Sequence, residues 1–299
     1  MEHNHSHRQS YNKAFAVGIS LNLIYIIVEF IYGIIANSMA LIADAGHNLS
    51  DVLGLVLAWG ASYLASKSPT EKRTYGFRKS TVLASLINAV ILLIAVGAIA
   101  IESVKRFTAP QIIDSQIIIY VAAIGVVINA FTAYLFFAGH KKDLNIKGAF
   151  LHMAADAAVS LGVVIAAVII GYTNLYWIDP VISLIIVFII TVGTWGLLKE
   201  SVNLSLDAVP KNINIEKVRN YLFNLEGVKN VHDLHIWAMS TTETALTVHL
   251  FKPDSGYNDK FIEMINEDLK NKFEIDHATI QIETSGKCND CNMNGNSNI

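Results

Sequence analysis

Long apolar runs dominate the first two thirds of the chain. A bilayer core of roughly 30 Å needs about 20 mostly apolar helical residues, and we identify six such runs before residue 200. The pattern therefore predicts six membrane-spanning helices. They lie at 14–36, 39–65, 81–104, 115–138, 149–172 and 178–198.

After residue 200 the pattern becomes that of a soluble module. Apolar residues recur first at helical spacing, then in two β-branched runs around a polar turn, then again in a helical and an alternating pattern. The predicted elements are a helix at 215–225, strands at 230–239 and 244–252 joined through Ser240–Glu243, a helix at 257–273 and a strand at 278–283. The fold class is a membrane all-α six-helix domain with a C-terminal α+β module of order αββαβ. The predicted domains are a tail at 1–13, the membrane domain at 14–200, the module at 201–285 and a flexible tail at 286–299.

Composition supports this division. The chain is 53% hydrophobic and only 16% charged, with a mean hydropathy of +0.43, which is too apolar for a soluble protein. Residues 1–199 carry 13 Lys+Arg against 10 Asp+Glu, whereas residues 200–299 carry 9 against 15. Neither part has the basic excess that phosphate neutralisation requires, so we expect no nucleic-acid partner.

Loop charges predict the orientation in the bilayer. With the N-terminus placed in the cytoplasm, the inside segments hold eleven Lys and Arg residues and the outside loops hold two. Both termini are therefore expected to be cytoplasmic. The polar leader has three histidines and lacks a small-residue cleavage site, so the first helix is expected to stay in the membrane.

Two membrane helices carry ionisable residues at the same spacing. His47 and Asp51 lie four residues apart, as do His152 and Asp156, so each pair shares one helix face. Two nitrogens and two oxygens in a tetrahedron suit Zn²⁺, and also Co²⁺ or Cd²⁺, better than Mg²⁺ or Ca²⁺. The alternative is polar contact between helices, but that role would not require identical spacing and chemistry twice.

Other polar residues in these runs are weaker candidates. Asp44 shares the face of His47 and has three possible roles: hydrogen-bond partner of His47, vestibule carboxylate or interface residue. Glu29 either relays protons or lines a cation path, or it pairs with a neighbouring helix. Asn22 shares the face of Glu29. Residues expected to act in packing, capping or at interfaces are Asn88, Glu102, Asn129 and Asp179.

Five motifs together carry a family resemblance. They are SMALIADAGHNLSD, TYGFRKS, HMAAD, WIDPVIS and NVHDLHIW. In this order they resemble the cation diffusion facilitator family, in its zinc-transporting branch, over about residues 14–285.

The resemblance implies a six-helix homodimeric transporter in the bilayer, with a metallochaperone-like (ferredoxin-like) cytosolic domain. Such a protein exports Zn²⁺ in exchange for H⁺ by alternating access, here from the cytoplasm across the plasma (inner) membrane of a bacterium. On this pattern the transport-site ligands are His47, Asp51, His152 and Asp156.

The resemblance also implies a zinc site in the cytosolic module. His232, His249 and Glu283 resemble its ligands, and His277 is a possible fourth. Gln281 occupies a position where some relatives have a ligand. Alternation along a regular strand predicts that His235 lies on the opposite face from His232, as a packed or surface histidine.

The tail contains the only two cysteines, Cys288 and Cys291, three residues apart. They cannot form a disulfide framework for the fold, and their spacing suggests metal or redox chemistry. They are similar to a cysteine pair that some relatives use for cytosolic zinc. The leader EHNHSH either completes that half site or acts as a metal-buffering tract without fixed geometry.

Transport has three rival functions. A membrane metalloenzyme is disfavoured because no HExxH-like motif is present and four ligands leave no open coordination position. A metal sensor would not need two costly intramembrane ligand pairs. A passive channel remains an alternative that flux against a proton gradient would separate.

Overall fold

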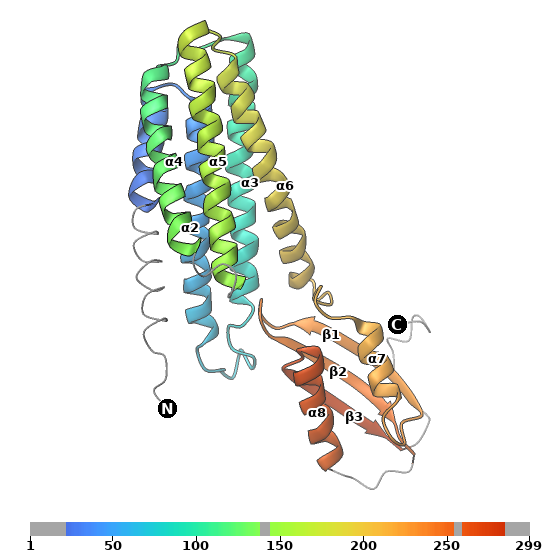
Figure 1. Cartoon of the computed structure of the whole chain (residues 1–299). Coiled ribbons are helices and arrows are strands. Elements are labelled where there is room, and N and C mark those ends of the chain that lie inside the picture. The colour runs from blue at the N-terminus through green and yellow to red at the C-terminus, as the bar shows by residue number, and fades with distance from the viewer. Residues whose placement is uncertain (1–21, 138–143, 254–258, 285–299) are drawn as a thin grey trace, which may run out of the picture. The chain divides into compact units, whose positions relative to one another are not determined.

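The computed structural model describes residues 22–137, 144–253 and 259–284 (Figure 1). The chain divides into two compact units, residues 1–56 with 88–196 and residues 57–87 with 197–299. Three of the long helices therefore contribute residues to both units.

Five helices within the described residues are long and apolar enough to cross a membrane. They are α2 (Met39–Ala65), α3 (Ser80–Thr108), α4 (Ser115–Phe137), α5 (Leu144–Thr173) and α6 (Ile178–Ser205). A shorter apolar helix spans Asn22–Ile35, and the preceding part of the predicted first span lies outside the described residues.

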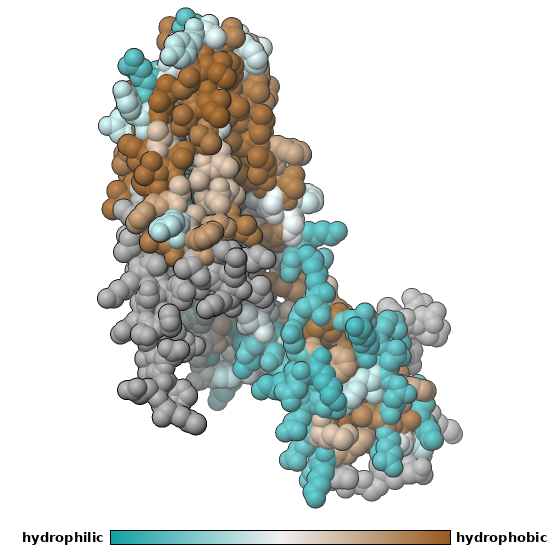
Figure 2. Space-filling view, viewed as in Figure 1, coloured by the Kyte–Doolittle hydropathy of each residue, from teal (hydrophilic) through white to brown (hydrophobic). Residues whose placement is uncertain are grey.

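Small residues form much of the core between the membrane helices. Ala40, Ala122 and Ala167 are buried in it, and small side chains let helices approach closely. Large apolar residues such as Ile94 and Phe188 are more than half exposed, as expected for side chains in lipid. Figure 2 shows this hydrophobic surface on the helices and a mainly hydrophilic one on the C-terminal module.

The start of α2 is held by a carboxylate from α6. The Asp179 side chain accepts hydrogen bonds from the backbone N–H groups of Met39 (2.8 Å) and Ala40 (3.3 Å) and from the Ser38 hydroxyl. The Ser38 oxygen in turn accepts from the N–H of Leu41 at 3.1 Å. These contacts satisfy donors that the first helical turn leaves free, which confirms a capping role for Asp179.

The C-terminal module is a small α/β domain with a mixed sheet. Its elements are α7 (Ile215–Phe223), β1 (Asn230–Ala238), β2 (Thr244–Phe251), α8 (Asp259–Phe273) and β3 (His277–Glu283). The strand order is β1-β2-β3, with β1 and β2 antiparallel and β2 and β3 parallel.

Both helices of the module pack on the same face of this sheet. Leu222 of α7 and Leu269 of α8 are fully buried against Leu246, Val248 and Leu250 of β2. The side chains between these β2 residues lie on the other face and are only partly buried. One sheet face is thus the core, and the other is available for polar chemistry.

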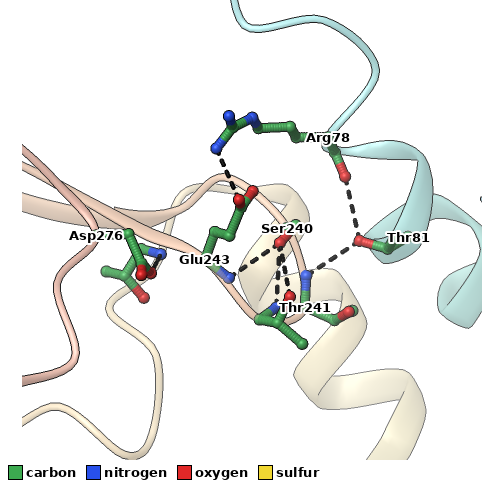
Figure 3. Close-up of polar contacts among 8 residues, drawn as sticks. Arg78, Thr81, Ser240, Thr241, Glu243 and Asp276 are labelled. Carbon is green, nitrogen blue, oxygen red and sulfur yellow. Dashed lines mark hydrogen bonds and ion pairs between the residues drawn. The ribbon is translucent and has the colours of Figure 1, made fainter. Parts of the chain in front are cut away.

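The turn between β1 and β2 contacts the segment that leads into α3 (Figure 3). Arg78 forms an ion pair of 2.8 Å with Glu243, and the N–H of Thr241 donates to the Thr81 hydroxyl at 3.0 Å. Inside the turn, the Ser240 oxygen accepts from the N–H of Glu243 at 2.9 Å. All these residues belong to the second compact unit, so its two parts are joined at this turn.

Candidate metal centres

Helices α2 and α5 bring the two predicted pairs together. His152 Nε2 lies 3.2 Å from Asp51 Oδ2 and 3.6 Å from Asp156 Oδ2. His47 Nε2 lies 3.7 Å from Asp51 Oδ2 and 3.8 Å from Asp156 Oδ1. Each carboxylate therefore faces histidines of both helices, so the four residues form one cluster.

The polar atoms of this cluster fit a metal ion. Asp156 is only 3% exposed. Within the described residues, Asp51 Oδ2, Asp156 Oδ2 and His47 Nδ1 are buried and have no hydrogen-bond partner. Burying such groups unpaired is costly, and a cation between the two carboxylates would offset the cost for their oxygens. Two imidazoles and two carboxylates are a donor set that Zn²⁺ accepts.

Two further carboxylates of the membrane helices, Glu29 and Asp44, are fully buried. Glu29 accepts a hydrogen bond from the Tyr25 hydroxyl at 2.7 Å, and Asp44 accepts one from the Ser160 hydroxyl at 2.9 Å. Each carboxylate retains one buried oxygen without a hydrogen-bond partner in the described part of the chain. Asp44 is thus joined to α5 through Ser160.

Sequence reasoning missed Tyr25 and Ser160, although helical spacing could have indicated both. Tyr25 precedes Glu29 by four residues and Ser160 follows Asp156 by four, so each shares a face with a singled-out carboxylate. Gly125 of α4 makes room for Tyr25, because a Cβ there would lie 2.1 Å from the tyrosine oxygen.

The weaker membrane candidates have varied surroundings. Asn22 Nδ2 lies 3.4 Å from the Met153 sulfur, and Glu102 is half exposed beside Lys105 and Arg106. Asn129 is buried, and its side-chain atoms have no hydrogen-bond partner among the described residues. The Asn88 amide packs closely on the position of Gly54.

The polar face of the module sheet carries a second cluster. His232 of β1, His249 of β2 and Glu283 of β3 place one ligand atom each within 4.8 Å of one another. Glu283 Oε2 lies 3.3 Å from His232 Nε2, and Glu283 Oε1 lies 3.0 Å from His249 Nδ1. Both nitrogens of His232 and Nδ1 of His249 are buried without a hydrogen-bond partner in the described chain. This donor set also fits zinc.

Other predicted residues of the module lie elsewhere. His277 precedes Glu283 by six residues on β3, about 20 Å along an extended strand, and its ring contacts Tyr75. It is therefore not a fourth ligand of this cluster within one subunit. Gln281 Nε2 donates to Glu283 Oε1 at 3.3 Å. Cys288, Cys291 and the leader histidines lie outside the described residues.

The prediction that His235 faces away from His232 was wrong because β1 is not regular, whereas the predicted surface position agrees with a His235 side chain that is 49% exposed. His232 pairs with His249 and His235 pairs with Thr247, so three steps along β1 match two along β2. This β-bulge places His235 on the same face as His232, since directly paired residues share a face. The buried positions Val231, Leu234 and Ile236 show the same slip in spacing.

Comparison with known proteins agrees with this architecture. Residues 15–204 match the family profile described as "Cation efflux transmembrane domain". Residues 210–285 match the one described as "Cation efflux protein, cytoplasmic domain". The chain belongs to the cation efflux family, the zinc-transporter branch of the cation diffusion facilitators, and is an integral membrane protein of the transporter class.

Similar proteins extend over almost the whole chain. The metal cation efflux system protein CzcD of Cupriavidus metallidurans is 34% identical over 94% of this chain and 89% of its own length. The cadmium, cobalt and zinc/H(+)-K(+) antiporter of Bacillus subtilis is 32% identical over 96% and 94%. The zinc transporter ZitB of Escherichia coli is 32% identical over 98% and 96%. The solved metal-bound C-terminal domain of the C. metallidurans CzcD covers 24% of this chain and 99% of its own, at 36% identity and a TM-score of 0.22.

Proposed function

We propose that this protein exports Zn²⁺, and to some extent Cd²⁺ and Co²⁺, from a bacterial cytoplasm in exchange for protons. The observation that carries the proposal is that His47 and Asp51 of α2 lie close to His152 and Asp156 of α5. The names of the Bacillus antiporter and the ZitB transporter support the same ions and the exchange.

The exchange follows from competition for shared lone pairs. Zinc binds histidine and aspartate only when they are deprotonated, so a proton and a metal ion exclude each other. An empty, fully ionised cluster would be costly in a low-dielectric core, so protons replace zinc during the return step. Histidine, with an ordinary pKa of about 6.5, suits this exchange near neutral pH. Glu29 and Asp44 lie beside the cluster as further proton acceptors.

The finer architecture belongs to the same proposal. It includes the six spans and the cytoplasmic termini that the sequence predicts, and it is supported by the five long apolar helices of the described residues. The protein works as a homodimer by alternating access. The cytosolic module is ferredoxin-like and binds regulatory zinc through His232, His249 and Glu283.

Zinc flux in proteoliposomes tests this function. Purified protein is reconstituted with a zinc-sensitive dye inside, and zinc is added outside with and without an imposed pH gradient. Exchange predicts that a proton gradient directed out of the vesicle accelerates zinc uptake and drives it above the external concentration. Uptake that only equalises zinc, whatever the gradient, would identify a channel. An enzyme or sensor would give no flux above empty liposomes.

A further inference from the structure

The β-bulge brings a carboxylate between two histidines of the module. Asp233 Oδ1 lies 3.0 Å from His235 Nε2, and Asp233 Oδ2 lies 3.5 Å from His249 Nε2. His249 is thus flanked on both ring nitrogens, since its Nδ1 faces Glu283 at 3.0 Å. Asp233 is not among the residues that the sequence predicts as metal ligands.

The two nitrogens of His249 have different surroundings. A neutral imidazole carries one N–H donor and one lone pair. Only the lone pair can bind a metal ion, so the opposite nitrogen must hold the proton. Nδ1 lies 3.0 Å from Glu283 in the cluster, which leaves Nε2 as the nitrogen that carries the proton, and Nε2 faces Asp233 Oδ2 at 3.5 Å, longer than an ordinary hydrogen bond. A carboxylate in this position fixes the tautomer and the ring orientation of a ligating histidine.

The backbone at Asp233 places its carboxylate between the two histidines. Asp233 has φ +52°, in the left-handed region that glycine adopts most easily and that aspartate adopts more often than most other residues. This conformation lies inside the bulge of β1, between His232 and His235, and the carboxylate there faces both His235 and His249.

We propose that Asp233, itself held by His235, is the positioning residue for His249 and sets the affinity of the cytosolic site for zinc-like divalent ions. This inference rests on the proposed metal site of the module. His235 is half exposed and holds Asp233 Oδ1, so that Asp233 Oδ2 remains directed at His249.

Zinc affinity of the full-length protein tests the proposal. Asp51→Ala and Asp156→Ala are introduced as a background, so that the membrane cluster does not bind zinc. Asp233→Gly is then expected to weaken zinc binding about 10-fold to 100-fold in competition with a chelator. Its metal-free thermal midpoint should stay the same or rise, because glycine suits the left-handed backbone. Asp233→Asn, whose side-chain oxygen still accepts an N–H, should lose less than about tenfold.

A second readout reports the tautomer itself. Nitrogen-15 NMR of labelled histidines, assigned with His249→Gln, should show Nε2–H for His249 in the background protein. In Asp233→Gly the signal should become a mixture of tautomers. A merely structural role of Asp233 would leave this spectrum unchanged.

Three results would overturn the proposal. The first is equal zinc affinity in Asp233→Gly and the background protein. The second is an equally large loss in Asp233→Asn accompanied by one fewer oxygen neighbour in zinc X-ray absorption, which would make Asp233 a direct ligand. The third is binding that is insensitive to His232→Ala, which shows that the proposed metal site itself is wrong. This last result is distinguished from the others because it involves no change at Asp233.

Discussion

Individual side chains at the membrane cluster are expected to be indispensable. Asp51→Ala removes the carboxylate that faces histidines of both α2 and α5. Residues that merely hydrogen-bond to metal ligands cost about 10-fold to 100-fold when lost, so removing a ligand should reduce proton-driven zinc flux more than about 100-fold. Proteoliposome flux is the measurement, and Glu102→Ala on α3 is the control that should transport normally. Normal flux in a folded Asp51→Ala protein would show that Asp51 is not a ligand of the transported zinc ion.

The ligand type at His47 should control which ions pass. His47→Asp replaces a borderline nitrogen donor by a hard oxygen. The variant should therefore transport Mn²⁺ better, relative to Zn²⁺, than the parent does. Competitive flux with both ions measures the ratio. An unchanged ratio would remove His47 from the path of the ion.

Helical spacing predicted that each His–Asp pair shares one helix face, because four residues make about one helical turn. It did not predict that these two helices lie side by side. The same reasoning failed at His235, where one extra residue in β1 reverses the alternation. The signal was present in the apolar positions Val231, Leu234 and Ile236, whose first interval is three residues and whose second is two. A bulge is set by a few local contacts, so the average pattern of a strand conceals it.

Among the elements, α2 depends on a cap supplied by another helix. Asp179→Ala leaves the N–H groups of Met39 and Ala40 without their acceptor, and hydrogen bonds to a charged group are worth about 1.5–3 kcal/mol. The free energy of unfolding of the protein in detergent should fall by about that amount, and its thermal midpoint should fall accordingly. Ser38→Ala removes the acceptor of the Leu41 N–H and one of the three donors to Asp179, and losing such a cap residue should cost about 0.5–2 kcal/mol. An Asp179→Ala protein no less stable than Ser38→Ala would contradict the capping role.

Helices α7 and α8 are linked by a group that titrates in acid. Asp268 accepts hydrogen bonds from Lys272 (2.8 Å) and from the Tyr221 hydroxyl (2.6 Å). Lys272, and then Tyr221, hold the pKa of Asp268 below its ordinary value. Burial, and then the bond to Asp268, raise the pKa of Tyr221, which stays protonated as a donor.

Because the pKa of Asp268 is lowered in the folded protein, the stability of the folded state should decrease in acid. The contribution of Asp268 is present above its unfolded pKa of about 3.9 and is lost as pH falls through the lower folded pKa. The protection factors of the α8 amides, which compare the exchange rate with the intrinsic rate at the same pH, should therefore fall on acidification below about pH 4. Asp268→Asn should show lower protection factors at neutral pH and a smaller change in acid. Identical acid profiles for both proteins would refute the link.

The positions of the elements followed from apolar periodicity, but their ends did not. The predicted sixth span ended at 198, whereas α6 continues to Ser205. Backbone hydrogen bonds carry a helix beyond its apolar stretch into polar residues, so hydrophobicity measures the membrane-embedded part only. The pairing of β2 with β3 could not be derived either, because it depends on the path of α8 across the sheet.

At the scale of the whole molecule, the two parts of the chain differ in net charge. Residues 200–299 have 9 Lys+Arg and 15 Asp+Glu, a formal charge of −6. Two copies of the module side by side repel each other at neutral pH. Divalent ions bound by His232, His249 and Glu283 would offset part of that charge, so zinc should favour a closer pair of modules.

Distances between labelled modules of two copies of the full-length protein test this proposed regulatory role of zinc. Adding zinc should shorten them, and the His232→Ala, His249→Ala double variant should respond weakly because it retains only Glu283 of the cluster. The same variant should still transport, at a lower rate or at a higher zinc threshold, since the membrane cluster is intact. Raising ionic strength should shorten the zinc-free distance in both proteins, because salt screens repulsion between exposed charges. A correctly folded double variant without any flux would instead place the module histidines on the path of the transported ion.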